Sequence, residues 1–167
     1  APQPGEVVVD CTLGYGGHAA VLLQQVGPAG KLIGFDLDAG NLPNVKSRLE
    51  AVGHPFVLHH GNFAGFAKVL GEESADGCDC LLADLGMSSM QVEDSARGFS
   101  YMRGGPLDMR MDPSRGRTAA ELLMTFSVDD LAAAFRELGD EPQADRIAEA
   151  IVSARREKPI EETRQLA

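Results

Sequence analysis

Cysteine is scarce in this sequence. Cys11, Cys78 and Cys80 are its three cysteines in 167 residues. Cys78 and Cys80 lie two positions apart in an apolar run, but no second cysteine pair is present to complete a zinc site. We therefore expect three free, buried thiols in a reduced cytosol, and no bound metal.

Long apolar runs are lacking as well. No run approaches the roughly 18 residues that a bilayer-spanning helix needs, and the first residues lack the basic and apolar regions of a secretory signal. We expect a cytoplasmic protein without a membrane partner. Its hydrophobic residues, 44% of the total, are enough for a packed core.

Positive charge is the third shortage. The formal net charge is -10, which argues against a nonspecific nucleic-acid coat because such binding depends on a basic surface. The charge is uneven, however, since residues 97–117 contain five arginines against two aspartates. This stretch is typical either of a polyanion contact or of a solvated loop, and composition alone leaves both open.

Four short apolar segments predict buried strands, and helix candidates fill the gaps between them. The strands are expected at 6–10, 31–36, 55–60 and 78–85, and the helices at 17–26, 42–52 and 63–70. Each gap has room for one helix, as the crossover between parallel strands requires. The pattern predicts an α/β fold with a parallel, doubly wound sheet.

The pattern changes after residue 85. Residues 86–117 show no clear period, and a loop of this length is usually functional or disordered. Helices are expected again at 118–125, 127–138 and 143–156, with Ser127 and Asp130 forming a capping box. We assign 1–105 to the N-terminal part of a Rossmann-like domain and 106–167 to an inserted helical subdomain. The C-terminal return of the sheet is expected outside this chain.

A glycine-rich loop follows the first expected strand. The strand ends in Asp10, and Gly14, Gly16 and Gly17 precede the next helix. Glycines let the backbone turn sharply and let a ligand approach the peptide groups. Asp36 ends the second strand, where an acid accepts hydrogen bonds from ribose hydroxyls. The loop also fits the dinucleotide fingerprint, so a nicotinamide-dependent oxidoreductase is a rival interpretation.

Two acids favour a methyl donor over a dinucleotide. Asp10 stands just before the loop and would repel a pyrophosphate, whereas S-adenosylmethionine carries an ammonium and a sulfonium. Asp84, at the end of the fourth expected strand, adds a second negative group at the same edge of the sheet. In the plainer alternative both acids only end their strands. The residues favour S-adenosylmethionine as the cofactor.

Asp84 and Ser88 are the candidate catalytic residues. They follow a strand's carboxyl end, where doubly wound folds place their reacting groups. An exocyclic amine on a base is a weak nucleophile, because its lone pair is delocalised into the ring. Acceptors such as Asp84 and Ser88 would bind its N–H groups and hold the nitrogen in line with the methyl, and positioning is the main contribution to such a displacement.

Several motifs together resemble the RsmH (MraW) family. They lie at 10–18, 84–89 with Gln91, 97–100, and 105–112, where the sequence reads GPLDMRMD. The resemblance continues through 144–156 and 159–167 and covers essentially the whole chain. It implies a Rossmann-like methyltransferase sheet, incomplete here, with an inserted helical subdomain. The implied activity is S-adenosylmethionine-dependent methylation of a cytidine N4 in small-subunit ribosomal RNA.

The resemblance also implies roles for single positions. Cofactor contacts are implied for Gly16, Gly17, His18, Asp36 at the ribose, Phe63 beside the adenine, Asp84 and Gln91. Arg97, Arg103 and Arg110 are candidates for RNA phosphate contacts next to an unstacked cytidine. Three structural alternatives stay open: Phe63 as a core residue, His18 as a helix-start residue, and Arg110 with Asp108 as internal pairs.

The implied partner is small-subunit ribosomal RNA or an assembling 30S-type particle. The oligomeric state is open, a homodimer included. Besides the oxidoreductase, two rivals remain: a methyltransferase acting on DNA or protein, and a non-catalytic ribosome-assembly module that keeps the methyltransferase fold.

Overall fold

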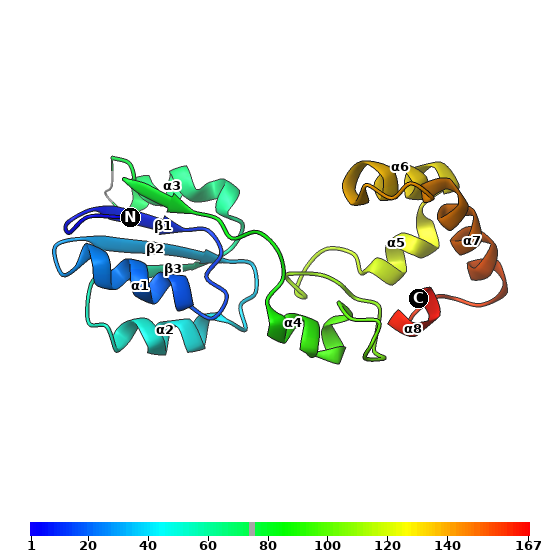
Figure 1. Ribbon diagram of the computed structural model, residues 1–167, viewed down its shortest axis with the longest axis horizontal. Helices are drawn as coiled ribbons and strands as arrows, with labels where there is room; N and C mark the ends of the chain where they lie inside the picture. Colours follow the sequence, from blue (N-terminus) through cyan, green and yellow to red (C-terminus); the bar gives the residue numbers. More distant parts are fainter. Residues whose placement is uncertain (74–75) are drawn as a thin grey trace. The chain divides into compact units, whose positions relative to one another are not determined.

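The computed structural model of the chain describes residues 1–73 and 76–167 (Figure 1). These form two compact units, Ala1–Gly86 and Met87–Ala167, and each is described by itself. The expected domain boundary after residue 105 falls inside the second unit. Hydrogen bonds tie the chain before this point to the chain after it: the Met109 amide donates to the Arg97 carbonyl, and the Thr163 amide to the Gly105 carbonyl.

The first unit is built on a parallel sheet. Its strands are β1 (Val7–Asp10), β2 (Lys31–Asp36), β3 (Phe56–His60) and β4 (Cys80–Leu82). All pairs are parallel and the strand order is β3-β2-β1-β4, which confirms the predicted α/β sheet. The chain moves outward from β1 to β3 and then returns to the other side of β1. Ligands of such folds bind at this reversal, outside the carboxyl ends of the strands.

Helices cover both faces of this sheet (Figure 1). They are α1 (Gly17–Val26), α2 (Leu42–Glu50), the 3-10 helix η1 (Phe63–Gly65) and α3 (Phe66–Glu72). One core joins the sheet to α1 and α2 and includes Val8, while the other contains Val9 and Leu70 of α3. Neighbouring strand residues point to opposite faces, so Val8 and Val9 belong to different cores.

The second unit is helical. Its elements are α4 (Ser89–Glu93), the 3-10 helix η2 (Ser95–Arg97), α5 (Ala119–Thr125), α6 (Val128–Gly139), α7 (Ala144–Glu157) and α8 (Thr163–Leu166). Its core contains Leu107, Leu123, Leu131, Ala132, Ala148, Ile151, Val152 and Ile160. The predicted capping box at Ser127 and Asp130 is confirmed at the start of α6.

The structure differs from the sequence-based expectations mainly around residue 85. The expected strand 78–85 is shorter, because β4 pairs only with β1 and their last pair is Asp10 with Leu82. Asp84 therefore lies two residues beyond the strand. The segment 86–117 contains α4 and η2 rather than loop alone.

The structure bears on three sequence-based expectations, for the cysteine thiols, for a bound metal and for membrane-spanning helices. All three cysteines are free; Cys11 is buried, whereas Cys78 and Cys80 are only half-buried. In the described ranges, no three His, Cys, Asp or Glu side chains gather closely enough to hold a metal ion. None of the helices described is both long and apolar enough to cross a bilayer.

Candidate functional site

The glycine loop begins at Asp10, which has no exposed surface. Its Oδ1 accepts the Thr12 amide at 3.0 Å. Gly14 and Gly16 have φ values of 50° and 73°, a region that disfavours other residues. A Cβ on Gly16 would also lie 3.1 Å from Val45 Cγ1 of α2. The backbone conformation therefore favours glycine at position 16, directly before α1, and the close Val45 side chain adds to this preference.

Asp36 ties the end of β2 to this loop. Its Oδ2 accepts the Gly14 amide at 2.8 Å and the Asn41 side-chain amide at 3.2 Å, and its Oδ1 accepts the Asp38 amide at 2.7 Å. A carboxylate accepts hydrogen bonds at about four positions. The three bonds leave one acceptor position on Oδ1, and its contact with a ribose hydroxyl stays a prediction. The hydrogen bond from Asn41 to Asp36 was not predicted from the sequence.

Asp84 lies at the same edge of the sheet. Its amide donates to Thr12 Oγ1 at 2.8 Å, which fixes the backbone just past β4 to the loop after β1. Its Oδ2 lies 3.9 Å from His18 Nδ1 in α1, with both side chains about two-thirds exposed, at 67% and 66%. The structure therefore brings together the predicted Asp84 and His18. Thr12 belongs to the same group through its bond to the Asp84 amide. In the sequence, its place inside the glycine loop was the only sign of this role.

Negative charge accumulates here. Burial raises the pKa of Asp10 above its ordinary value; Asp36 and Asp84 act in the same direction, against the Thr12 amide and His18. The buried Asp10 Oδ2 has no hydrogen-bond partner. An unpaired buried acceptor is costly, and a cationic group bound nearby lowers that cost. The site thus fits a positively charged ligand better than a pyrophosphate.

The raised pKa of Asp10 yields a test of stability against pH. A carboxyl whose pKa is higher in the folded state than its ordinary 3.8 stabilises the fold below pH 3.8, and this contribution is lost as pH rises through the folded pKa. Asp10→Asn has no such loss. We expect the unfolding free energy of the variant, relative to the natural protein, to rise with pH across this range in urea titrations. A difference that stays constant or falls with pH would contradict the assignment.

Phe63 follows β3 and opens η1. Asn62 caps this turn by accepting the Ala64 amide at 2.8 Å. The Phe63 ring is half-buried and packs against the core that contains Val9 and Phe35. The packing supports the structural alternative for Phe63, and its contact with an adenine stays a prediction.

Ser88 and Gln91 form the capping box of α4 in the second unit. Ser88 Oγ accepts the Gln91 amide at 3.2 Å, and Gln91 Oε1 accepts the Ser88 amide at 3.0 Å. The three-residue spacing of Ser and Gln is a known helix-start signal that could have revealed α4. Both side chains thus have structural roles, and their catalytic and cofactor roles remain predictions.

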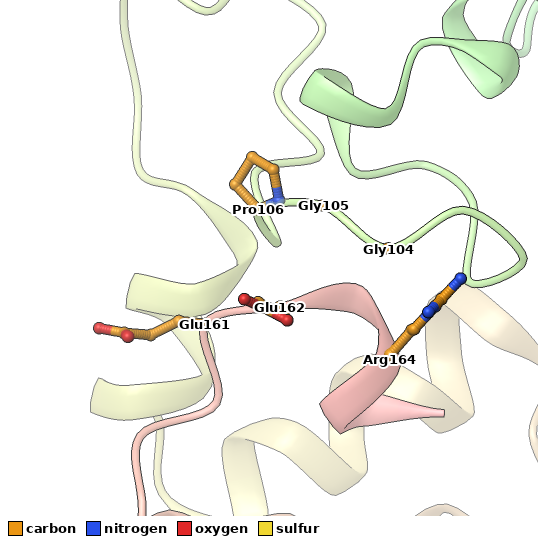
Figure 2. Close-up of a pocket in the computed structure, with 6 residues that line it drawn as sticks. All are labelled: Gly104, Gly105, Pro106, Glu161, Glu162 and Arg164. Carbon is orange, nitrogen blue, oxygen red and sulfur yellow. The ribbon is translucent and has the colours of Figure 1, made fainter.

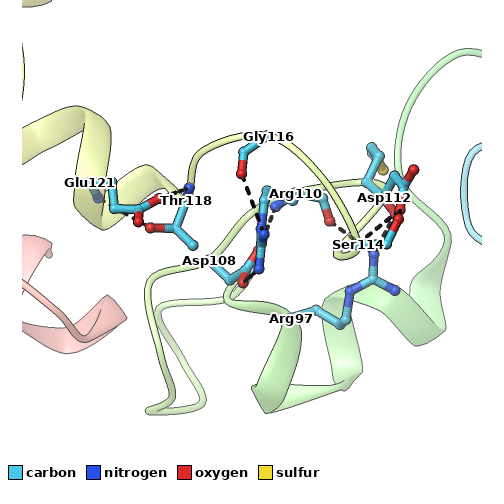
Figure 3. A network of polar contacts seen from close by, with 9 residues as sticks. Arg97, Asp108, Arg110, Asp112, Ser114, Gly116, Thr118 and Glu121 are labelled. Atoms are coloured by element: carbon cyan, nitrogen blue, oxygen red, sulfur yellow. Dashed lines mark hydrogen bonds and ion pairs between the residues drawn. The ribbon is translucent and has the colours of Figure 1, made fainter.

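The predicted RNA-contacting arginines make hydrogen bonds within the second unit. Arg97 donates to the carbonyls of Arg110 and Met111 at 3.0 and 2.9 Å, as drawn in part in Figure 3. Arg110 donates two hydrogen bonds to the Asp108 carboxylate, from Nε to Oδ1 at 2.8 Å and from Nη2 to Oδ2 at 2.6 Å. Arg103 donates to the Glu93 carbonyl at 3.1 Å. These bonds support the internal-pair alternative, and contacts with RNA remain a prediction.

Further acids complete this network (Figure 3). Asp112 accepts from the Ser114 hydroxyl at 2.6 Å and from Arg115 Nε at 2.6 Å. The Arg110 side chain lowers the pKa of Asp108, and the Ser114 side chain lowers that of Asp112. Hydrogen bonds and ion pairs therefore hold residues 97–119 together in one loop, and this segment is not a free basic arm.

An open pocket of about 420 Å³ lies elsewhere in the second unit (Figure 2). Its lining consists of Gly104, Gly105, Pro106, Glu161, Glu162 and Arg164. Pro106 forms an isolated antiparallel β-bridge with Glu162, just before α8, and the pocket lies at this bridge. The predicted site residues are not among those that line it.

Comparison with known proteins adds independent findings. The model of the MraW methylase family matches residues 1–167. A Syntrophotalea carbinolica protein named ribosomal RNA small subunit methyltransferase H is 46% identical over 99% of this chain and 53% of its own length. Its namesake from Desulfosudis oleivorans is 44% identical over 99% of this chain and 53% of its own length. The chain spans about half the length of these curated relatives.

Proposed function

Because this chain belongs to the MraW methylase family, we propose that it is part of an enzyme that methylates the exocyclic N4 of a cytidine in small-subunit ribosomal RNA, with S-adenosylmethionine as the donor. One observation carries this: the acids Asp10, Asp36 and Asp84 lie at the glycine loop that follows β1, and the buried Asp10 Oδ2 lacks a partner. The names of the relatives support a small-subunit RNA substrate, either free or in an assembling 30S-type particle.

The loop and its supports would hold the cofactor. Gly14, Gly16 and Gly17 let the backbone approach the ligand closely, and Asp36 offers its remaining Oδ1 position to a ribose hydroxyl. The remaining contacts that we propose are made by His18, Phe63, Asp84 and Gln91. When bound, S-adenosylmethionine supplies an electrophilic methyl group on a sulfonium, and the acids at the sheet edge favour that charge.

Asp84 and Ser88 would act on the nucleophile. The exposed Asp84 carboxylate accepts an N–H of the exocyclic amine, which limits rotation of the amine and raises the electron density on its nitrogen. Asp84 has a fixed backbone for this purpose, since its amide is bonded to Thr12. Ser88 offers a second acceptor oxygen, and the proton lost by the amine passes to Asp84 or water. Arg97, Arg103 and Arg110 would border the RNA.

Two measurements on the full-length protein separate the candidate functions. Calorimetry should detect binding of S-adenosylmethionine and none of NAD; the reverse would support an oxidoreductase. Labelled methyl groups should pass from S-adenosylmethionine to small-subunit particles that lack the modification. Particle binding without transfer would support a non-catalytic assembly module, and transfer to DNA or protein in place of RNA would reject the proposed substrate.

Asp36→Ala should weaken S-adenosylmethionine binding by about 1–3 kcal/mol, the usual effect of losing a charged hydrogen-bond partner. The variant loses a ribose acceptor and also the anchor of the Gly14 amide. Calorimetry gives the affinity. Asn41→Ala is the matched control, because it removes one bond to Asp36 but keeps the carboxylate; we expect a smaller loss. Unchanged affinity in Asp36→Ala would reduce Asp36 to a strand-end residue.

A further inference from the structure

The Thr12 hydroxyl binds the chain just beyond β4. The last pair between β1 and β4 is Asp10 with Leu82, and the Cys11 amide donates to the Leu82 carbonyl at 2.8 Å. Two residues later, the Asp84 amide donates to Thr12 Oγ1 at 2.8 Å. A side-chain acceptor therefore continues the contact between the two segments where the pairing of their backbones ends.

Packing contributes little to the position of Asp84. Residues 83–86 are all exposed, and Leu85, which directly follows Asp84, is 70% exposed. The Asp84 carboxylate lies 3.9 Å from His18 Nδ1, which is too long for a hydrogen bond. An exposed segment with few packing contacts opens readily unless hydrogen bonds hold it. Within the described ranges, the bond to Thr12 is therefore the contact that fixes the backbone of Asp84.

Thr12 itself belongs to a firmly held part of the loop. Its amide donates to Asp10 Oδ1 at 3.0 Å, and Asp10 has no exposed surface. Its two neighbours, Cys11 and Leu13, are 4% and 3% exposed. The Leu13 amide donates to the Phe35 carbonyl at 3.0 Å, which ties the loop to β2. The Thr12 hydroxyl thus projects from a rigid backbone toward a segment that is otherwise exposed.

The chemistry of threonine suits this task. Its hydroxyl oxygen accepts hydrogen bonds, whereas the similarly shaped valine side chain accepts none. Branching at Cβ also restricts χ1, so the oxygen keeps a defined place relative to the backbone. Precise placement matters because an error of about 1 Å in the position of a reacting group can reduce a rate about 100-fold.

We propose that Thr12 is a positioning residue for methyl transfer. Its hydroxyl fixes the backbone of Asp84, so that the Asp84 carboxylate meets the attacking amine in line with the methyl group. This inference rests on the proposed function, which it deepens by adding a residue that acts through Asp84.

Thr12→Val in the full-length protein tests the proposal. Valine keeps the shape of the side chain and the backbone bond to Asp10, and the amide that loses its acceptor belongs to an exposed residue, so the variant should fold. We expect kcat for transfer to unmodified small-subunit particles to fall about tenfold, within the range for a slightly misplaced group. KM and S-adenosylmethionine affinity should not change.

Two further variants control for this result. Thr12→Ser keeps the hydroxyl and should restore most of the rate. Thr125→Val removes a hydroxyl from an exposed threonine at the end of α5 and should leave kcat unchanged. An unchanged kcat in Thr12→Val, or a loss of cofactor affinity in place of the loss in kcat, would overturn the inference.

A double variant shows whether Thr12 acts through Asp84. In Asp84→Ala no carboxylate remains to be positioned, and the effects of residues that share one contact do not add. Adding Thr12→Val to Asp84→Ala should therefore lower kcat by less than about twofold. A further tenfold fall would mean that Thr12 acts independently of Asp84, and the inference would be wrong.

Hydrogen exchange gives a readout that does not depend on methyl transfer. The Asp84 amide should exchange about two- to tenfold faster in Thr12→Val, the effect of one hydrogen bond. The Cys11 amide, which donates to the Leu82 carbonyl, should exchange equally in both proteins. If the natural protein transfers no methyl group, the proposed function fails, and exchange decides the inference: equal rates at Asp84 overturn it, and faster exchange in the variant supports it.

Discussion

Gly98→Ala should destabilise the second unit by about 2–4 kcal/mol, the combined scale of backbone strain and overpacking. Gly98 has φ 73°, and a Cβ there would lie against the Pro106 carbonyl oxygen and 2.7 Å from the Asp108 amide nitrogen. Both are backbone atoms in the hydrogen-bonded loop 97–119, so neither can move without breaking hydrogen bonds. Urea denaturation of the variant and the natural protein measures the loss.

Gly116→Ala separates the two causes of this loss. Gly116 has φ 81°, but a Cβ there would have no atom within 4 Å. This control therefore carries only the backbone cost, about 1 kcal/mol. Equal losses in the two variants would mean that the contacts of Gly98 with the Pro106 segment contribute nothing.

Asp84→Asn should lower the rate of methyl transfer about 100-fold, the scale on which a displaced or weakened acceptor acts. The variant loses the negative charge that we propose accepts the amine N–H, while the backbone bond from residue 84 to Thr12 does not involve the side chain. Because the Asp84 side chain is 67% exposed, we expect an unchanged unfolding midpoint. Single-turnover transfer at saturating S-adenosylmethionine gives the rate of the chemical step.

The control for this rate is Asp129→Asn, which neutralises an exposed acid in the first turn of α6. It removes the same charge from the protein and should leave transfer unchanged. Should Asp84→Asn transfer methyl groups at the natural rate, Asp84 would be only a residue that follows β4.

The sequence predicted the sheet well because its strands are locally distinct. β2 and α1 have the predicted bounds, since Gly27 ends the helix with a positive φ of 67°. The end of β4 was not predictable from hydrophobicity, because Leu85 continues the apolar run and yet is 70% exposed. The number of residues that β1 offers for pairing sets that end, and a property of a distant segment does not appear in a local pattern.

The site was predictable in part for the same reason. Asp10 and Asp36 end their strands as expected, and Asp84 lies close enough to the end of β4 to reach the same edge of the sheet although the strand ends two residues earlier. The bond between the Asp84 amide and Thr12 depends on the loop conformation. The arginine network was hidden because Arg97 donates to backbone carbonyls 13 and 14 residues away. Every residue type offers such carbonyls, and composition therefore cannot distinguish a bound arginine from a free one.

The central place of β1 in the sheet has a consequence for the nascent chain. One edge of β1 can pair once β2 has left the ribosome, but the other edge needs β4, whose last paired residue is Leu82. At about 5–20 residues per second, the interval between Gly34 and Leu82 lasts roughly 2–10 s. An unpaired strand edge attracts other strands during such an interval. Substitutions that delay the β1–β4 pairing would therefore reduce the yield of folded chains before they change the stability of a finished one.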